Sequence, residues 1–357
     1  MKKIYRLLAF ATLAAVVTGC ANEEENDGAA VAASGNVEFV TRTPQPASAR
    51  GPVYTADEFR ILAFRDAGSG YVYQQEIPLA GMTFTQTTLK GSAQLPAGVY
   101  KFLPSYGLVT PGNYAWPDLT NAALSDALYV THTQGSFPAV FMLNEKLDDV
   151  PAYTVSLDGP KQTVSATLRR AVSRVDVLFI RAEKDPATGA YKEVAGDDVF
   201  GPEKLASARF SYTDANSRLG LSGEKVDGVF DPVHTVTASD AVLTMGTGAA
   251  TTVGADKYDF ENVQPADIIS GSAHLKGTYL IPNADNAATA KLELLLTSGE
   301  NNTRTIILSQ PIPVERNKVT LIRVYVLGDN VFTTKVDFAV EVDTAWDGSN
   351  FVDEEID

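Results

Sequence analysis

The sequence has one cysteine, three histidines and no apolar run long enough to cross a bilayer as a helix. Cys20 is the only cysteine among 357 residues, so no disulfide can form within the chain. His132, His234 and His274 are far apart, without the spacing of metal ligands. Phosphate-binding Gly-Lys-Ser/Thr loops and Gly-x-Ser-x-Gly nucleophile elbows are also missing. We therefore expect no catalytic residue, no metal and no cofactor.

Positive charge is also scarce. The chain has 29 basic and 44 acidic residues and a net charge of −15. Nucleic-acid binding requires a basic face for the phosphates, so nucleic acid is excluded as an expected partner. Charged residues make up only 20% of the chain, whereas Val, Thr, Tyr, Phe, Gly and Pro are plentiful. This composition favours short strands and many turns, and it predicts an all-β fold of sandwich or barrel type.

The first 19 residues have the pattern of a bacterial export signal. Met1-Lys2-Lys3 is a charged start, and an apolar run of about 11 residues follows from Leu7. A membrane-spanning helix needs ~20 apolar residues, so we predict a signal peptide over 1–19 rather than a span. Its removal takes away three basic residues and no acidic one, which lowers the net charge from −15 to −18. A plain signal peptide that happens to contain Cys20 is the alternative.

The end of this signal, Val17-Thr18-Gly19-Cys20, resembles the lipobox of bacterial lipoproteins. The resemblance implies that a diacylglycerol is attached to the Cys20 thiol and that cleavage leaves Cys20 as the first residue. Residues 20–35 are acidic and then small, which predicts a flexible tether. Glu23 to Glu25 lie where acidic residues accompany transfer to the outer surface in lipoproteins of the Bacteroidales type, although a merely solvated linker has the same composition.

The rest of the chain is long enough for two domains. We predict an N-terminal β-sandwich over 36–163 and a C-terminal β-sandwich over 164–357. Residues 37–43 alternate weakly and predict a first strand, and Lys291–Thr297 with Arg304–Leu308 predicts a hairpin. Asp118 to Leu128 has roughly helical apolar spacing and predicts a short helix within a loop.

The segment after the first expected strand contains a candidate proteolytic site. Residues 44–52 are rich in proline and small residues, which cannot continue a hydrogen-bonded strand. Arg50 precedes Gly51 there, in the kind of exposed segment that proteases cut. The next proline is Pro52, so it does not block cleavage after Arg50. An ordinary loop arginine is the alternative.

An aromatic, Gly- and Pro-rich stretch from Tyr106 to Trp116 has two interpretations. Tyr106, Tyr114 and Trp116 could stack on sugars or another surface ligand, because aromatic rings pack on sugar faces. They could instead pack into the core of the N-terminal domain, which is the interpretation we favour. Mutation of Tyr114 and Trp116 to Ala separates the two.

The last long alternating stretch, 331–346, predicts a strand with one apolar and one charged edge. Such a strand could lie in an apolar groove. The apolar edge consists of Phe332, Val336, Phe338, Val340, Val342 and Trp346.

Four features occur together in order: the lipobox at Cys20, a strand followed by Arg50-Gly51, the central stretch 168–177 and the late Val314-Glu-Arg-Asn317. In this layout the chain resembles the fimbrillin family of Bacteroidales, the subunits of type V pili. The resemblance implies two tandem transthyretin-like Greek-key β-sandwiches, and an outer-membrane lipoprotein from which an Arg-specific protease removes the lipidated first strand. It also implies that a neighbouring subunit then supplies a replacement strand, which is β-strand addition. The end of the chain, from Val331 to Trp346 onward, resembles the family's donor segment, so its apolar edge is the expected donor strand.

The resemblance leads us to expect a non-enzymatic structural or adhesive subunit of a surface fimbria, with stalk or tip favoured. Its expected partners are other fimbrial subunits, the outer membrane through the lipid on Cys20, and possible host or bacterial surface ligands. Two alternatives stay open. Anchor subunits of the family keep their lipid and are not cut, so a permanently lipidated anchor is one. A surface lipoprotein that binds a glycan or host ligand is the other.

Overall fold

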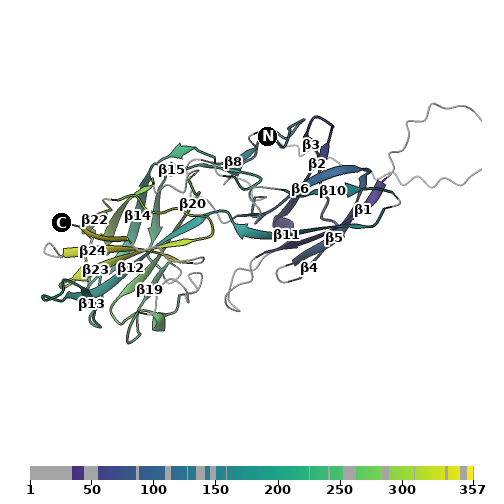
Figure 1. Cartoon of the computed structure of the whole chain (residues 1–357). Coiled ribbons are helices and arrows are strands. Elements are labelled where there is room, and N and C mark those ends of the chain that lie inside the picture. Colours follow the sequence, from purple (N-terminus) through teal and green to yellow (C-terminus); the bar gives the residue numbers. More distant parts are fainter. Residues whose placement is uncertain are drawn as a thin grey trace, which may run out of the picture. The chain divides into compact units, whose positions relative to one another are not determined.

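The computed structural model describes most of the chain after the tether, and for 337–345 and 352–356 it describes the backbone alone. The described residues are 34–43, 55–85, 88–108, 114–126, 128–133, 141–144, 150–157, 159–224, 226–239, 242–251, 263–283, 289–308, 310–333, 337–345 and 352–356. They form a protein made almost entirely of β-strands (Figure 1). The predicted all-β sandwich-type fold is confirmed.

The first sheet has nine strands in the order β3-β2-β6-β9-β11-β1-β5-β4, with β10 paired to β6. Its strands are β1 (Ser34–Arg42), β2 (Phe59–Asp66), β3 (Tyr71–Glu76), β4 (Thr83–Thr85), β5 (Thr88–Pro96), β6 (Gly98–Tyr106), β9 (Met142–Asn144), β10 (Ala152–Val155) and β11 (Gln162–Arg170). Buried side chains from both halves of this sheet meet in one core, for example Phe39 of β1 and Phe102 of β6. Alternate residues point to this core, because successive side chains of a strand face opposite sides.

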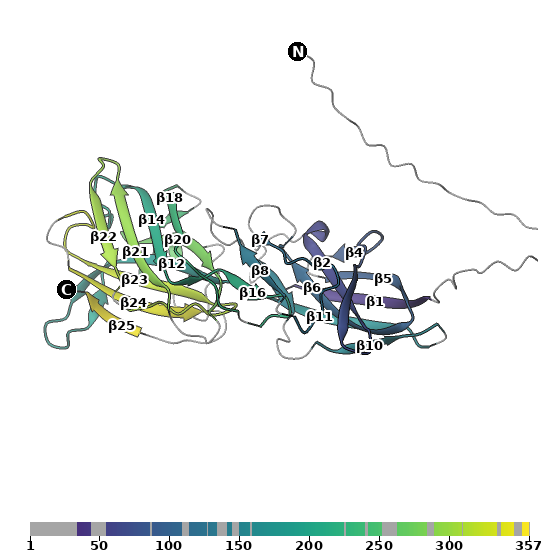
Figure 2. The same cartoon turned by 90° about the horizontal axis from the view of Figure 1, so that it is seen from above.

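Two further sheets pack face to face around the largest core. One contains β19 (Leu243–Met245), β20 (Ala273–Leu280), β12 (Ser173–Lys184), β23 (Val319–Leu327), β24 (Asp337–Ala345) and β25 (Val352–Ile356) in that order, with β13 (Tyr191–Glu193) paired to β12. The other is β18 (Val233–Thr237), β14 (Leu205–Thr213), β21 (Lys291–Ser298) and β22 (Thr303–Ile307). Figure 2 shows the two layers. Side chains such as Phe179 of β12 and Phe210 of β14 fill the space between them.

Short elements complete the described part of the chain. A small sheet joins β7 (Tyr114–Ala115), β8 (Tyr129–His132) and β16 (Arg218–Gly220), and β15 (Ala215–Asn216) pairs with β17 (Val229–Phe230). The described helices are two single 3-10 turns, η1 (Ala56–Glu58) and η2 (Pro265–Asp267). Within the described residues, no helix has both the length and the apolar character that a membrane crossing requires.

Several local predictions can be compared with these elements. The hairpin is confirmed, since β21 pairs with β22 from Glu293–Ile307 to Thr297–Thr303. The predicted helix over 118–128 is wrong, because the described residues 118–126 and 128 form turns and one isolated bridge and no helix. Asp118 accepts a hydrogen bond from the Thr120 N–H and Asp126 accepts one from the Ala123 N–H, which are bonds that compete with helix formation.

The division into two sandwich domains remains a prediction, but the predicted boundary between residues 163 and 164 falls within a strand. Residues 163 and 164 lie inside β11, which pairs with β1 and β9 in the first sheet. The first sheet therefore continues to Arg170, and the next sheet begins with β12 at Ser173.

Truncation of Leu294 should show how much the central core contributes to stability. Leu294 lies on β21 and is 1% exposed, whereas Ile307 on the adjacent β22 is 58% exposed. We expect Leu294→Ala to lower the free energy of unfolding by about 2–5 kcal/mol, because it removes buried methyl groups and leaves a cavity. The matched control Ile307→Ala should cost less than about 1 kcal/mol. Urea denaturation followed by circular dichroism measures both; equal losses would contradict this placement of the core.

Candidate functional site

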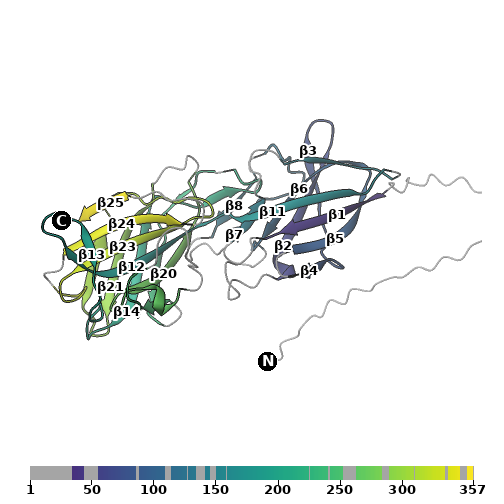
Figure 3. The ribbon, with the colours of Figure 1, turned by 60° about the horizontal axis from the view of Figure 1, so that its bottom comes forward.

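The first described strand, β1, is inserted between two other strands of its sheet (Figure 3). It pairs antiparallel with β5 from Ser34–Pro96 to Arg42–Thr88. On its other edge it pairs in parallel with β11 from Val37–Gln162 to Arg42–Thr167. The strand that comes first in the described chain therefore occupies an interior position of the sheet. Its removal would leave unpaired backbone N–H and C=O groups on both β5 and β11.

The inward face of β1 fills a slot in the core. Val37, Phe39 and Thr41 are all at most 2% exposed. The Phe39 ring contacts the Phe102 ring edge to face, with their centroids 5.1 Å apart. At Gly35 a side chain is impossible without rearrangement, because an added Cβ would lie 2.5 Å from the carbonyl oxygen of Ser156. The slot thus accepts apolar side chains at alternate positions and is closed at its Gly35 end.

The outward face of β1 carries one carboxylate, Glu38, which interacts with charged and polar groups near both edges of the strand. The Glu38 Oε1 atom lies 3.7 Å from Lys90 Nζ on β5 and 3.6 Å from Lys161 Nζ just before β11. Thr163 Oγ1 on β11 donates a hydrogen bond of 3.4 Å to Glu38 Oε2. Both flanking strands therefore contribute groups that bind one carboxylate on β1. Spacing along the chain gives no sign of these contacts, since the two lysines are far from Glu38 in sequence.

The predicted lipidation and cleavage residues, Cys20, Arg50 and Gly51, lie outside the described residues. Lipid attachment at the first and cleavage between the other two therefore stay predictions. The structure describes the two ends of the segment that contains Arg50, because β1 ends at Arg42 and the chain is described again from Thr55. A cut after Arg50 would separate β1 covalently from every later strand.

The aromatic candidates are held by protein contacts. Tyr106 and Tyr114 are each 8% exposed and belong to hydrophobic cores. Burial raises the pKa of the Tyr114 hydroxyl well above its usual value. Trp116 is half-buried; its Nε1 donates to the Leu108 carbonyl at 3.0 Å, and the Arg60 guanidinium lies 4.0 Å from the ring centroid. These contacts favour packing over a ligand-binding role.

The predicted strand over 331–346 begins later than expected. Phe332 lies in a turn and packs on the core near Phe200, with ring centroids 6.4 Å apart. In this turn the Asn330 side chain accepts a hydrogen bond from the Phe332 N–H, and the described strand β24 runs from Asp337 to Ala345. The backbone of β24 includes Phe338, Val340 and Val342, whereas Val336 and Trp346 lie outside the described residues.

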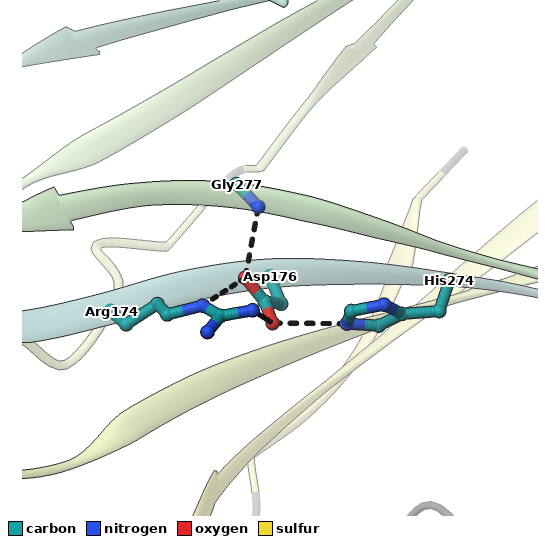
Figure 4. Close-up of polar contacts among 4 residues, drawn as sticks. All are labelled: Arg174, Asp176, His274 and Gly277. Atoms are coloured by element: carbon teal, nitrogen blue, oxygen red, sulfur yellow. Dashed lines mark hydrogen bonds and ion pairs between the residues drawn. The ribbon is translucent and has the colours of Figure 1, made fainter. Parts of the chain in front are cut away.

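The central sequence motif forms a buried ionic cluster on β12 (Figure 4). Arg174 donates from Nε to Asp176 Oδ1 at 2.8 Å and from Nη2 to Oδ2 at 2.6 Å. His274 Nε2 on β20 lies 2.9 Å from Asp176 Oδ2, and the Gly277 N–H donates to Oδ1 at 2.9 Å. A β-bulge between Val175 and Val177 accompanies this contact, because it interrupts the register opposite Gly277.

The cluster was not predictable from the motif alone. Alternation places Arg174 and Asp176 on the same side of β12, but it does not show that this side is buried as well. Burial tends to raise the pKa of Asp176, but the charge of Arg174 and the hydrogen bond with His274 outweigh it. The pKa of this carboxyl is therefore well below its usual value, and Asp176 is ionised inside the core.

The two motifs behind the sequence resemblance meet in space. The Asn317 N–H of the late motif donates to the carbonyl of Val172, within the central motif, at 3.1 Å. Arg316 Nη2 donates to the carbonyls of Leu143 and Asn144 at 3.1 and 2.9 Å. The late motif is thus hydrogen-bonded to β9 of the first sheet and to the connection between β11 and β12. Among the residues that the structure describes, no three His, Cys, Asp or Glu side chains form a group that could hold a metal ion.

Comparison with known proteins adds structural neighbours only. No family model matches the sequence, and no curated protein matches it. A fimbrial assembly protein from Parabacteroides distasonis aligns with a TM-score of 0.46 and 10% identity over 90% of this chain and 99% of its own. The fimbrial anchor protein Mfa2 from Porphyromonas gingivalis aligns with a TM-score of 0.40 and 13% identity over 86% and 97%. At these low values, neither likeness says what this chain does.

Asp176→Asn should test the ionic cluster. We expect the free energy of unfolding at pH 7 to fall by about 3–5 kcal/mol, because Arg174 then remains buried without its counter-charge. The folded-state pKa of Asp176 is lowered, so its contribution is present above the unfolded pKa of ~3.9 and is lost as the pH falls below that value. The difference between wild type and variant should therefore shrink in acid.

Denaturation at pH 7 and at a series of lower pH values measures this effect. Asp57→Asn is the control, since Asp57 is exposed on η1 and should change stability little. A constant gap between Asp176→Asn and wild type at all pH values would contradict the ionised, buried carboxylate.

Proposed function

We propose that this chain is a non-enzymatic structural or adhesive subunit of a cell-surface fimbria. It is exported as an outer-membrane lipoprotein with its lipid on Cys20, and it is assembled by protease-triggered β-strand exchange. The observation that carries the proposal is the position of β1, which precedes the candidate cleavage site Arg50-Gly51 and yet lies between β5 and β11. One cut thus turns an interior strand into a separate peptide.

The energetics of the slot support exchange. The side chains of Val37 and Phe39 each gain roughly 1.5–3 kcal/mol from burial, and the backbone pairs on both edges. While the chain is intact, the connection to β2 keeps β1 at a high effective concentration near its slot. After cleavage this advantage disappears, so a strand supplied by a neighbouring subunit can compete for the same place. A donated strand satisfies the backbone groups and covers the apolar slot together.

The stalk or tip role and the anchor role differ in one chemical event. A stalk or tip subunit loses residues 20–50, including the lipid on Cys20, when Arg50 is cut. An anchor subunit keeps residues 20–50 and the lipid. We favour the cleaved role because residues 44–52 are rich in proline and small residues, a sequence that cannot continue a strand and shield Arg50 within a ladder. The other candidate, Arg42, is the last residue of β1 and lies within its ladder.

The mature N-terminus on cells should decide between these roles. We expect mass spectrometry of the surface fraction to find a chain that begins at Gly51 when a trypsin-like protease is active, and a chain that begins at lipidated Cys20 when it is inhibited. Arg50→Ala should keep the lipidated start in both conditions, whereas the control Arg42→Ala should still be cut after Arg50.

A lipidated Cys20 start under both conditions in the wild type would mean a permanent anchor or a free-standing surface lipoprotein. The role of β1 in strand exchange would then be rejected.

A further inference from the structure

The four-stranded sheet beside the largest core ends in β18 on one side and in β22 on the other (Figure 2). Its three ladders are all antiparallel, so β18 and β22 run in opposite directions. Among the residues that the structure describes, each of these two strands pairs with one strand only. The other edge of such a strand carries backbone N–H and C=O groups that can pair with a strand of another chain.

The hydrogen bonds inside the sheet show which residues direct their backbone groups outward. The Tyr212 N–H donates to the carbonyl of Pro232, just before β18, so the even-numbered residues of β18 bind β14. The Leu308 N–H donates to the Leu292 carbonyl, so the even-numbered residues of β22 bind β21. In an antiparallel ladder the residues between these direct their groups to the opposite edge. These residues are Val233, Thr235 and Thr237 on β18 and Thr303, Thr305 and Ile307 on β22.

The side chains of these six residues are exposed and uncharged. Val233 and Ile307 are large and apolar, and they are 54% and 58% exposed. β18 contains no Asp, Glu, Lys or Arg, and the one charged residue of β22, Arg304, lies on the other face of the sheet with Ile306. Charged side chains commonly protect sheet edges from pairing with other chains. The exposed face of these two edges lacks that protection.

The two edges match each other residue by residue. When β22 of one copy lies antiparallel to β18 of another, with the outward-directed backbone groups facing each other, every facing pair on the exposed face is β-branched. Such cross-strand pairs stabilise a sheet. Pairing of β18 with β18, or of β22 with β22, over the whole strand would place each exposed apolar side chain opposite a threonine instead. The matched pairs are Val233–Ile307, Thr235–Thr305 and Thr237–Thr303.

We infer that β18 and β22 form a contact between copies of this chain, in which β22 of one copy adds to β18 of the next with Thr305 opposite Thr235. The contact uses two different edges of each copy, so it does not close and every pair of copies keeps one β18 and one β22 for further copies. No strand leaves its own sheet, and the contact is therefore independent of the proposed strand exchange.

The contact is small, because only five residues of each strand take part. We therefore expect weak association of copies in solution. The same contact gains strength where many copies are held together on one surface, because each further pair then forms at a high effective concentration. It would thus join neighbouring copies edge to edge.

Sedimentation equilibrium of the full chain with Cys20→Ser, which removes the only thiol and the lipid with it, measures this association. We expect the average mass to rise with concentration beyond that of two chains. Val233→Lys and Ile307→Lys should each weaken association about tenfold or more, because each places a charge opposite an apolar side chain. Leu157→Lys is the matched control: it adds the same charge at a side chain that is 55% exposed but belongs to neither edge.

A mixture of the two edge variants tests the pairing of unlike edges. The Val233→Lys chain keeps an unchanged β22, and the Ile307→Lys chain keeps an unchanged β18. These two edges should pair, and growth should stop at two chains because the remaining edges both carry a new lysine.

Cysteine pairs test the register without added charge. In the Cys20→Ser chain, Thr235→Cys mixed with Thr305→Cys should form a disulfide, because residues paired by hydrogen bonds lie about 5.5 Å apart between Cα atoms, within the range that a disulfide spans. Thr235→Cys mixed with Thr303→Cys should cross-link less, because these two residues are displaced by one pair.

The outcomes decide the inference. A chain that stays single up to about 1 mM has no contact of this kind, and the inference is rejected. Normal association of Ile307→Lys with loss in Val233→Lys would mean that two β18 edges pair, which rejects the role of β22. Equal weakening by Leu157→Lys would show a general effect of charge, and equal cross-linking of both cysteine pairs would reject the register.

Discussion

The fold depends on the requirement that a strand inside a sheet be paired on both edges. β1 meets this need for β5 and β11 at once, and its inward side chains fill the slot between them. Buried backbone groups without partners are costly, so the first sheet can lose β1 only if another strand takes its place. The slot also limits what that strand can be, because one end is closed by Ser156 and both sides carry a lysine.

The sheet that contains β12 and β20 is held together near its centre by a buried ionic cluster. In its centre, Asp176 binds Arg174 on its own strand and His274 on β20, so a shift of one strand against the other would leave a buried charge unpaired. β24 and β25 follow one another at the edge of this sheet, where the backbone of β24 pairs with β23 from Val319–Ala345 to Leu327–Asp337.

The strands were more predictable than the contacts between them. Weak alternation identified β1, and a suitable turn sequence at 298–302 identified the hairpin of β21 and β22. These strands each have one buried and one exposed face. The prediction of a helix over 118–128 was wrong because Asp118 and Asp126 accept hydrogen bonds from nearby backbone N–H groups in turns. The contacts of Glu38 and the cluster around Asp176 depend on strand order and on bulges, which local sequence does not specify.

The short connection between β11 and β12 has a mechanical consequence. Only Ala171 and Val172 separate the strand that pairs with β1 from the strand that pairs with β23. Tension applied along β1 would load its ladder in shear, with all hydrogen bonds sharing the force, and would pass into β11. From there the load path runs through two residues into β12 and its partner β23, and then into β24. The chain therefore has little slack between the slot of β1 and the centre of the next sheet.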